Sequence, residues 1–226
     1  NFSIAYKGVR SLGAYQHSLT STGDFRFTTN YHTKNNRYNI LAHVTALDLI
    51  NQQNGGLTDE SVLLFESNNS EFRDRGRLEV NFQDAENELK GFRVYGKQEF
   101  ELITKKDSTD QNKLFIGNVM SFEDKSYVFK QDVPFDDYGE SYKTSDLYKK
   151  GKLEDFNIQG YTRFENNYIG SLSAFIGYTN YNYGYNSVII FDDGRITNRL
   201  KGNLVQAGAS YKKTYKRHSS FHLIYN

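Results

Sequence analysis

Long segments of this chain alternate between apolar and polar side chains, a period of two that fits a β-strand and not an α-helix. In residues 92–102, one side carries Phe92, Val94, Gly96, Gln98, Phe100 and Leu102. The opposite side carries the charged side chains Arg93, Lys97, Glu99 and Glu101. The same alternation recurs in residues 25–32, 77–83, 156–164 and 168–179. A strand with so many charges on one face is not buried on both sides, so that face must meet water.

The alternation predicts about eleven strands, and their length limits the possible folds. They cover residues 1–10, 24–33, 37–50, 75–83, 91–104, 113–123, 125–133, 153–164, 168–180, 198–213 and 219–226. Many of them reach the ~10 residues that cross a bilayer at ~45° tilt. Strands of soluble proteins average about 5–6 residues. Strand length therefore predicts an all-β fold, an antiparallel transmembrane β-barrel, over a soluble β-sandwich.

Composition excludes several other classes of protein. The mean hydropathy is −0.72, and no run approaches the ~20 apolar residues of a spanning helix. The chain has no cysteine, which excludes a disulfide framework and a thiolate metal site or nucleophile. Its 28 Lys and Arg residues nearly balance 27 Asp and Glu residues and alternate with them in sign. No basic stripe marks a nucleic-acid partner.

The connections between the predicted strands alternate between short and long. Short turns are predicted at residues 34–36, 84–90, 123–125, 165–167 and 214–219. Longer loops are predicted at residues 11–23, 51–74, 105–112, 134–152 and 181–197. Bacterial outer-membrane barrels have short periplasmic turns and longer outer loops. The pattern therefore predicts that the long loops face the outside of the cell.

Aromatic residues cluster near the predicted strand ends. They are Tyr6, Tyr31, Tyr38, Phe164, Tyr168, Tyr178, Tyr181 and Tyr211. Rings at headgroup level would form the aromatic girdle of a membrane barrel. The alternative is that strands favour aromatic residues everywhere.

The predicted number of strands does not close a barrel. Single-chain bacterial barrels have an even number, and an open edge in lipid leaves backbone groups unpaired at several kcal/mol each. The chain begins at Asn1 without a signal segment and ends at Asn226 directly after a strand-like run. We therefore expect residues 1–226 to be one partial barrel domain, with further strands outside it.

The first hundred residues resemble a known family. The matching stretches are residues 6–13 (YKGVRSLG), 15–17 (YQH), 33–39 (TKNNRYN), 51–57 (NQQNGGL), 72–75 (FRDR) and 84–85 (DA). In combination they are similar to the putative porin family of Bacteroidetes outer membranes. The resemblance implies an outer-membrane barrel with more strands than are present here. It implies no catalytic or binding residues.

Charged side chains opposite apolar ones are the main functional signal. They are Arg26, Arg77, Glu79, Arg93, Lys97, Glu99, Glu101 and Arg163. An Arg or Lys facing lipid at the bilayer midplane costs ~2–4 kcal/mol, so these side chains should line the lumen. Mixed signs on neighbouring strands predict a wet pore crossed by ion pairs. The alternative is that the charges neutralise one another in a blocked lumen.

Other chemistry has weak support in the sequence. The five histidines have no metal-ligand spacing, and nothing local pairs Ser121, Ser171 or Ser173 with a histidine for hydrolysis. The acidic pairs at residues 136–137 and 192–193 lack the spacing of a calcium loop. We therefore expect no catalytic residues, no bound metal and no cofactor.

These observations predict a porin-like channel in the outer membrane of a Gram-negative bacterium. It would pass small hydrophilic solutes and contact outer-membrane lipid. The main alternative is an accessory barrel without an open pore, which binds other envelope proteins through its long outer loops in a secretion or nutrient-uptake complex. An outer-membrane hydrolase and a soluble β-sandwich are further alternatives.

Overall fold

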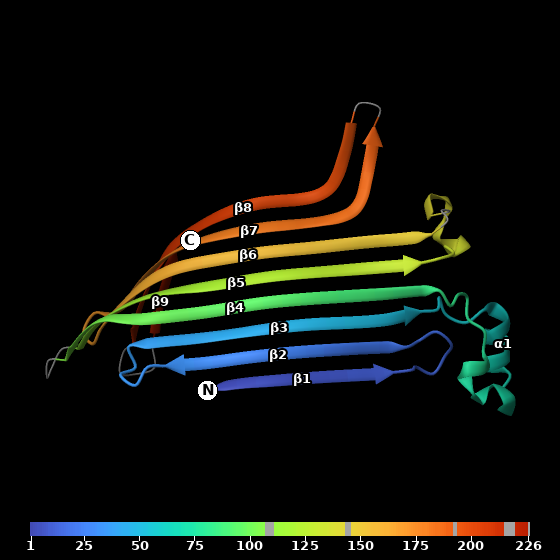
Figure 1. Cartoon of the computed structure of the whole chain (residues 1–226), viewed down its shortest axis with the longest axis horizontal. Coiled ribbons are helices and arrows are strands. Elements are labelled where there is room, and N and C mark those ends of the chain that lie inside the picture. The colour runs from blue at the N-terminus through green and yellow to red at the C-terminus, as the bar shows by residue number, and fades with distance from the viewer. Residues whose placement is uncertain (107–110, 143–145, 192–193, 215–219, 226) are drawn as a thin grey trace.

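The chain forms one antiparallel sheet in which every strand pairs with its neighbours in sequence (Figure 1). The computed structural model describes residues 1–106, 111–142, 146–191, 194–214 and 220–225. The nine strands are β1 (Phe2–Ser11), β2 (Thr20–His32), β3 (Tyr38–Gln53), β4 (Ala85–Lys106), β5 (Gln111–Gln131), β6 (Leu147–Asn166), β7 (Gly170–Phe191), β8 (Gly194–Thr214) and β9 (Ser220–Tyr225). The predicted all-β antiparallel fold is confirmed. The sheet is open, as expected for part of a barrel.

The predicted count of about eleven strands is wrong, because one expected boundary between strands and one expected strand do not exist. Segments 113–123 and 125–133 belong to the single strand β5, and segment 75–83 is not a strand. The predicted short turns at 84–90 and 123–125 disappear with them, because these residues lie within β4 and β5 except for Asp84.

Strand β5 continues through three consecutive charged residues because each finds a partner on a neighbouring strand or on its own strand. Glu123 accepts from Arg93 Nε at 3.0 Å and from Lys125 Nζ at 2.6 Å on one side of the sheet. Asp124 faces the other side and lies 3.5 Å from Lys152 Nζ. Charged runs usually mark turns, but cross-strand ion pairs make this run compatible with a strand.

Segment 75–83 belongs instead to a folded loop between β3 and β4. The loop contains helix α1 (Asp59–Glu66) and two 3₁₀ turns, η1 (Ser70–Arg73) and η2 (Arg75–Arg77). Leu78 is fully buried in this loop and Val80 is 8% exposed. The Glu79 backbone N–H donates to Ser61 Oγ at 2.8 Å, which ties the segment to α1. Alternation here reflects packing inside the loop rather than a two-faced strand.

The long connections lie at one end of the sheet, called the loop side, and short ones lie at the other end, called the turn side (Figure 1). Residues 12–19, 54–84 and 132–142 are on the loop side, and residues 33–37 and 167–169 are on the turn side. The predicted long loop at 105–112 is wrong, because on the turn side β4 continues to Lys106 and β5 begins at Gln111. Most of the predicted loop at 181–197 is strand, since β7 reaches Phe191 and β8 starts at Gly194. β6 likewise begins at Leu147, inside the loop predicted at 134–152.

The helices of the described residues are all short. None of them has the length and apolar character to cross a membrane.

Candidate functional site: the polar face of the sheet

Cross-strand register divides the sheet into two chemically distinct faces. Directly paired residues point to the same side, so the register can be followed from strand to strand. The apolar face carries Phe25, Val44, Phe92, Phe100, Ile116, Phe122, Phe156, Ile158, Ile176 and Val205. The polar face carries Arg26, Thr45, Arg93, Lys97, Glu99, Ser121, Glu123, Asn157, Gln159, Tyr161, Arg163 and Thr179.

Large side chains are exposed on the apolar face, and exposure varies on the polar face, where the Arg26 and Arg93 side chains are 58% and 44% exposed. On the apolar face, Ile116 is 51%, Ile176 is 63% and Val205 is 68% exposed. On the polar face, the charged side chains of Glu99 and Glu123 are 17% and 19% exposed. Soluble proteins rarely expose large contiguous apolar patches. The apolar face therefore needs an apolar surrounding, and the polar face meets water.

The apolar face has the height of a bilayer. Its apolar stretch runs from Phe92 to Phe100 on β4 and from Phe156 to Phe164 on β6, with aromatic residues at both limits. Each stretch spans about nine residues, close to the ~9–11 that cross a bilayer at ~45° tilt. On the loop side, the same face continues with charged residues, among them Lys90, Asp124 and Lys152.

Six of the eight predicted pore-lining residues share the polar face. They are Arg26, Arg93, Lys97, Glu99, Glu101 and Arg163. The other two, Arg77 and Glu79, lie in the loop between β3 and β4, so the strand that was expected to place them on the wall does not exist. Arg77 instead lies 3.4 Å from Glu71 within that loop.

Two ion-pair clusters lie on the polar face. In the first, Glu123 joins Arg93 and Lys125. In the second, Arg163 donates to Glu99 at 2.7 Å and to Glu165 at 2.8 Å. The Arg163 guanidinium also lies 4.4 Å from the centre of the Phe115 ring. Arg93 is thus held by a carboxylate on the neighbouring strand β5, and Arg163 by one carboxylate on its own strand and one on β4, across β5.

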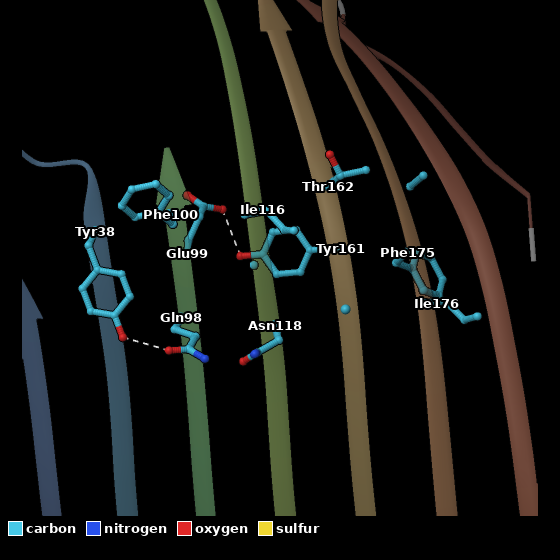
Figure 2. Close-up of a pocket in the computed structure, with 13 residues that line it drawn as sticks. Tyr38, Gln98, Glu99, Phe100, Ile116, Asn118, Tyr161, Thr162, Phe175 and Ile176 are labelled. Atoms are coloured by element: carbon cyan, nitrogen blue, oxygen red, sulfur yellow. Dashed lines mark hydrogen bonds between the residues drawn. The ribbon is translucent and has the colours of Figure 1, made fainter. Parts of the chain in front are cut away.

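Tyr161 completes the second cluster (Figure 2). Its hydroxyl donates to Glu99 at 2.9 Å across β5, and the ring covers Gly117. The Lys97 ammonium lies 5.9 Å from the centre of the same ring. Neither Tyr161 nor Glu123 is among the pore-lining residues predicted from the sequence. Tyr161 alternates with the apolar residues of its strand, so the alternation could have predicted that it lies on the polar face.

A groove of about 790 Å³ opens near the turn side (Figure 2). Tyr38, Gln98 and Asn118 line it on the apolar face, and the Tyr38 hydroxyl donates to Gln98 Oε1 at 2.8 Å. Gly160 leaves room in its wall, because a side chain there would meet nothing within 4 Å. Most of its lining faces away from the ion pairs, so the groove is not part of the polar site.

The polar face has no recognisable catalytic or metal centre among the described residues. His43 stacks on Tyr95 with ring centres 4.9 Å apart, and the Ser173 and Ser210 hydroxyls share a hydrogen bond of 2.7 Å. No group of three potential metal ligands occurs in the part of the chain that the structure describes. Residues 192–193 and 218 lie outside the described residues, as does the side chain of residue 222.

The three loops on the loop side pack into one layer. Gln16 Nε2 donates to the Gly76 carbonyl at 3.0 Å, and Gln83 Nε2 donates to Gln16 Oε1 at 2.6 Å. Phe82 contacts Phe135 and Tyr138 of the loop after β5, with ring centres 5.6 Å and 6.4 Å apart. Burial, and secondarily the Asp84 carboxylate, raises the pKa of Tyr138, so the phenol stays neutral.

A comparison with models of protein families shows to which family the chain belongs. A family model described as Putative porin matches residues 1–225. The chain belongs to the Putative porin family. The match extends the resemblance of the first hundred residues over the whole sheet, and it agrees with an antiparallel sheet that has one apolar and one polar face. No curated protein and no solved structure matches this porin-family chain.

Proposed function

We propose that this sheet is part of the wall of an outer-membrane porin that lets small hydrophilic solutes diffuse through a water-filled lumen. The observation that carries the proposal is the chemical division of the sheet into one apolar and one charged face. Large apolar side chains point outward over a bilayer-high band, while ion-paired charges occupy the opposite face. Lipid would cover the first face and water the second.

The charges on the polar face support the proposal that the transported solutes are polar. Arg93 is fixed by Glu123 on the adjacent strand, and Arg163 by Glu99 two strands away and Glu165 on its own strand, so positive and negative groups lie side by side across the wall. Such paired charges create a field across the lumen, which favours small polar solutes over apolar ones. We assign no catalytic residue and no cofactor to the wall.

The loops support a particular orientation of the sheet in the membrane. The turn side has short connections and the loop side carries the folded layer, which matches periplasmic turns and outer loops of bacterial barrels. We therefore place the loop side outside a Gram-negative outer membrane.

Single-channel recording tests the proposal. The full-length protein would be reconstituted in a planar bilayer, and its heat-modifiable migration would establish that the barrel is folded. Stable current steps proportional to salt concentration are the expected result. A folded, inserted barrel that never conducts contradicts the open channel.

A second candidate is an accessory barrel that docks another envelope protein through the loop layer. The supporting observation is the exposed apolar side of α1, where Leu63 is 69% and Phe65 is 46% exposed. This candidate predicts no conductance and co-purification of a partner that is lost when Leu63 and Phe65 are replaced by serine.

A further inference from the structure

Beyond the apolar band, the same face of β6 and β8 carries four basic side chains, which we call the basic cluster: Lys150, Lys152, Arg199 and Lys201. Register brings them together across the intervening strand β7. Lys152 and Arg199 both pair with Gly184, and Lys201 pairs with Asn182. Lys150 lies two residues from Lys152, on the same face of β6.

Gly184 lets the cluster converge. A Cβ at this position would lie 3.2 Å from Arg199 Nε, so the Arg199 side chain lies across β7. Adjacent strands are ~4.8 Å apart, and the missing side chain brings the guanidinium toward β6. Neighbouring Asn182 donates to Glu154 at 2.7 Å and adds no charge.

The cluster has more positive charge than its surroundings neutralise. Lys152 lies 2.7 Å from Glu154 and 3.5 Å from Asp124, and Glu154 also interacts electrostatically with Arg199, so these two carboxylates offset two of the four positive charges. The structure shows no ion pair for Lys150, Arg199 or Lys201 with any residue it describes. The corresponding rows of β3 and β4 are mainly acidic, with Asp48, Glu86 and Glu88 around Lys90. The excess positive charge is therefore local to β6 and β8.

Depth places Lys201 level with the lipid headgroups, and Lys152, Arg199 and Lys150 above them. Lys152 lies four residues beyond Phe156, the last apolar residue of that face on β6. At ~3.4 Å per residue and ~45° tilt this is about 10 Å above the apolar band. The headgroup region extends ~5–8 Å beyond the hydrocarbon core, and long basic side chains can bend toward it.

We infer that the basic cluster binds the phosphate groups of an anionic lipid in the outer leaflet. The inference rests on the proposed function, because it takes the apolar face as the lipid-facing one. Two observations favour a lipid over another partner: the cluster is continuous with the apolar band, and its charge is opposite to that of phosphate. Arg199 can bind phosphate in a bidentate way, and the lysines act as point charges.

Lipid binding to the delipidated full-length protein tests the inference. The probe is a glycolipid with two phosphates on its sugar headgroup, compared with the same lipid after phosphate removal, by native mass spectrometry. The test variant combines K150Q, R199Q and K201Q and leaves the paired Lys152 in place. The control variant combines K7Q, K149Q and K212Q, which removes equal charge from the polar face.

The expected result is that the wild type prefers the phosphorylated lipid and that the test variant loses this preference. Each basic group near an anionic surface strengthens binding roughly five-fold, so the loss should be on the order of 100-fold. The control variant should bind as the wild type does.

Three results would overturn the inference: no preference for phosphate in the wild type, unchanged binding in the test variant, or equal loss in the control. Inorganic phosphate is tested as a competitor. If phosphate at the same concentration as the lipid displaces the lipid completely, the cluster binds free anions instead. Conductance of the test variant is recorded in parallel. A conducting variant with unchanged lipid binding rejects only this inference, whereas a protein that never inserts into a bilayer rejects the proposed function.

Discussion

A tyrosine side chain lying over a glycine on the adjacent strand recurs in this sheet. Tyr161 covers Gly117 on β5, and Tyr181 covers Gly202 on β8. The absence of a side chain at the glycine lets the ring lie flat against the backbone of its neighbour. At Gly117 this position also directs the Tyr161 hydroxyl to Glu99. The small residue therefore positions a polar contact on the face that we assign to the lumen.

Replacing Gly117 with alanine should destabilise the sheet. A Cβ there would overlap the Tyr161 ring and lie 2.7 Å from the Gln98 carbonyl oxygen. Overpacking of this kind costs about 1–3 kcal/mol. The change should be measurable as a lower midpoint of urea-induced unfolding in lipid vesicles. Gly96→Ala is the matched control, because a side chain there meets nothing within 4 Å; equal loss in both variants would show that the ring contact is irrelevant.

Glu99 balances Arg163 on the polar face, so Glu99→Gln should shift ion selectivity toward anions. Arg163 would keep Glu165 as its one remaining carboxylate. The measurement is the reversal potential in a salt gradient across a planar bilayer. Glu88→Gln makes the same charge change on β4 but on the apolar-face side, and it should leave the reversal potential unchanged. Equal shifts in the two variants would contradict the assignment of the polar face to the lumen.

At the scale of elements, the strands are longer than the membrane requires. β4 and β7 each span 22 residues, about twice the ~9–11 that cross a bilayer. The additional residues of β7 lie mainly on the loop side, whereas β4 extends beyond the apolar band at both ends. The strands therefore extend the wall outward beyond the lipid and carry the loop layer with them.

Single cysteines along β6 should show alternating accessibility, and the natural absence of cysteine makes the experiment direct. Asn157→Cys and Gln159→Cys lie on the polar face and should react with a membrane-impermeant, water-soluble thiol reagent. Ile158→Cys lies between them on the apolar face and should stay unlabelled in lipid vesicles. Labelling of all three at similar rates would reject the two-face model.

At the scale of the whole molecule, the best-packed region is outside the membrane-height band. Leu78 and Ala85 are fully buried and Ser61 is almost so, all within or next to the loop between β3 and β4. In the sheet, by contrast, large side chains stay exposed because lipid is their expected surrounding. The loop layer is thus a small folded unit with its own core, attached to a wall stabilised by backbone hydrogen bonds and cross-strand pairs.

Leu78→Ala should loosen the loop layer without unfolding the sheet. Removing a buried leucine side chain costs roughly 2–5 kcal/mol, and this cost is borne by the loop alone. We expect faster protease cleavage within residues 54–84 while heat-modifiable migration of the barrel is retained. The control is Leu63→Ala on α1, which is 69% exposed and should change neither property. Loss of the folded barrel in the Leu78 variant would show that loop and wall fold as one unit.

Local alternation was enough to predict the fold class, the two-faced strands and the face on which six of the eight proposed pore-lining residues lie. Alternation is a local property, because successive side chains of a strand point to opposite sides whatever the strand pairs with. The same pattern led to a wrong strand prediction for residues 75–83. Leu78 is buried within its own loop, and such a buried residue gives the same local alternation as a strand. For the same reason Arg77 and Glu79 were placed on a wall they do not reach.

Which charges meet depends on the pairing of the strands and could not be predicted from alternation. The charged residues 123–125 are compatible with a turn until β4 and β6 supply Arg93 and Lys152 as partners. The contact of Tyr161 with Gly117, and the convergence of Lys152 and Arg199 over Gly184, likewise depend on the register between strands. Register joins residues that are distant in sequence, and a one-residue shift would move each of them to the opposite face.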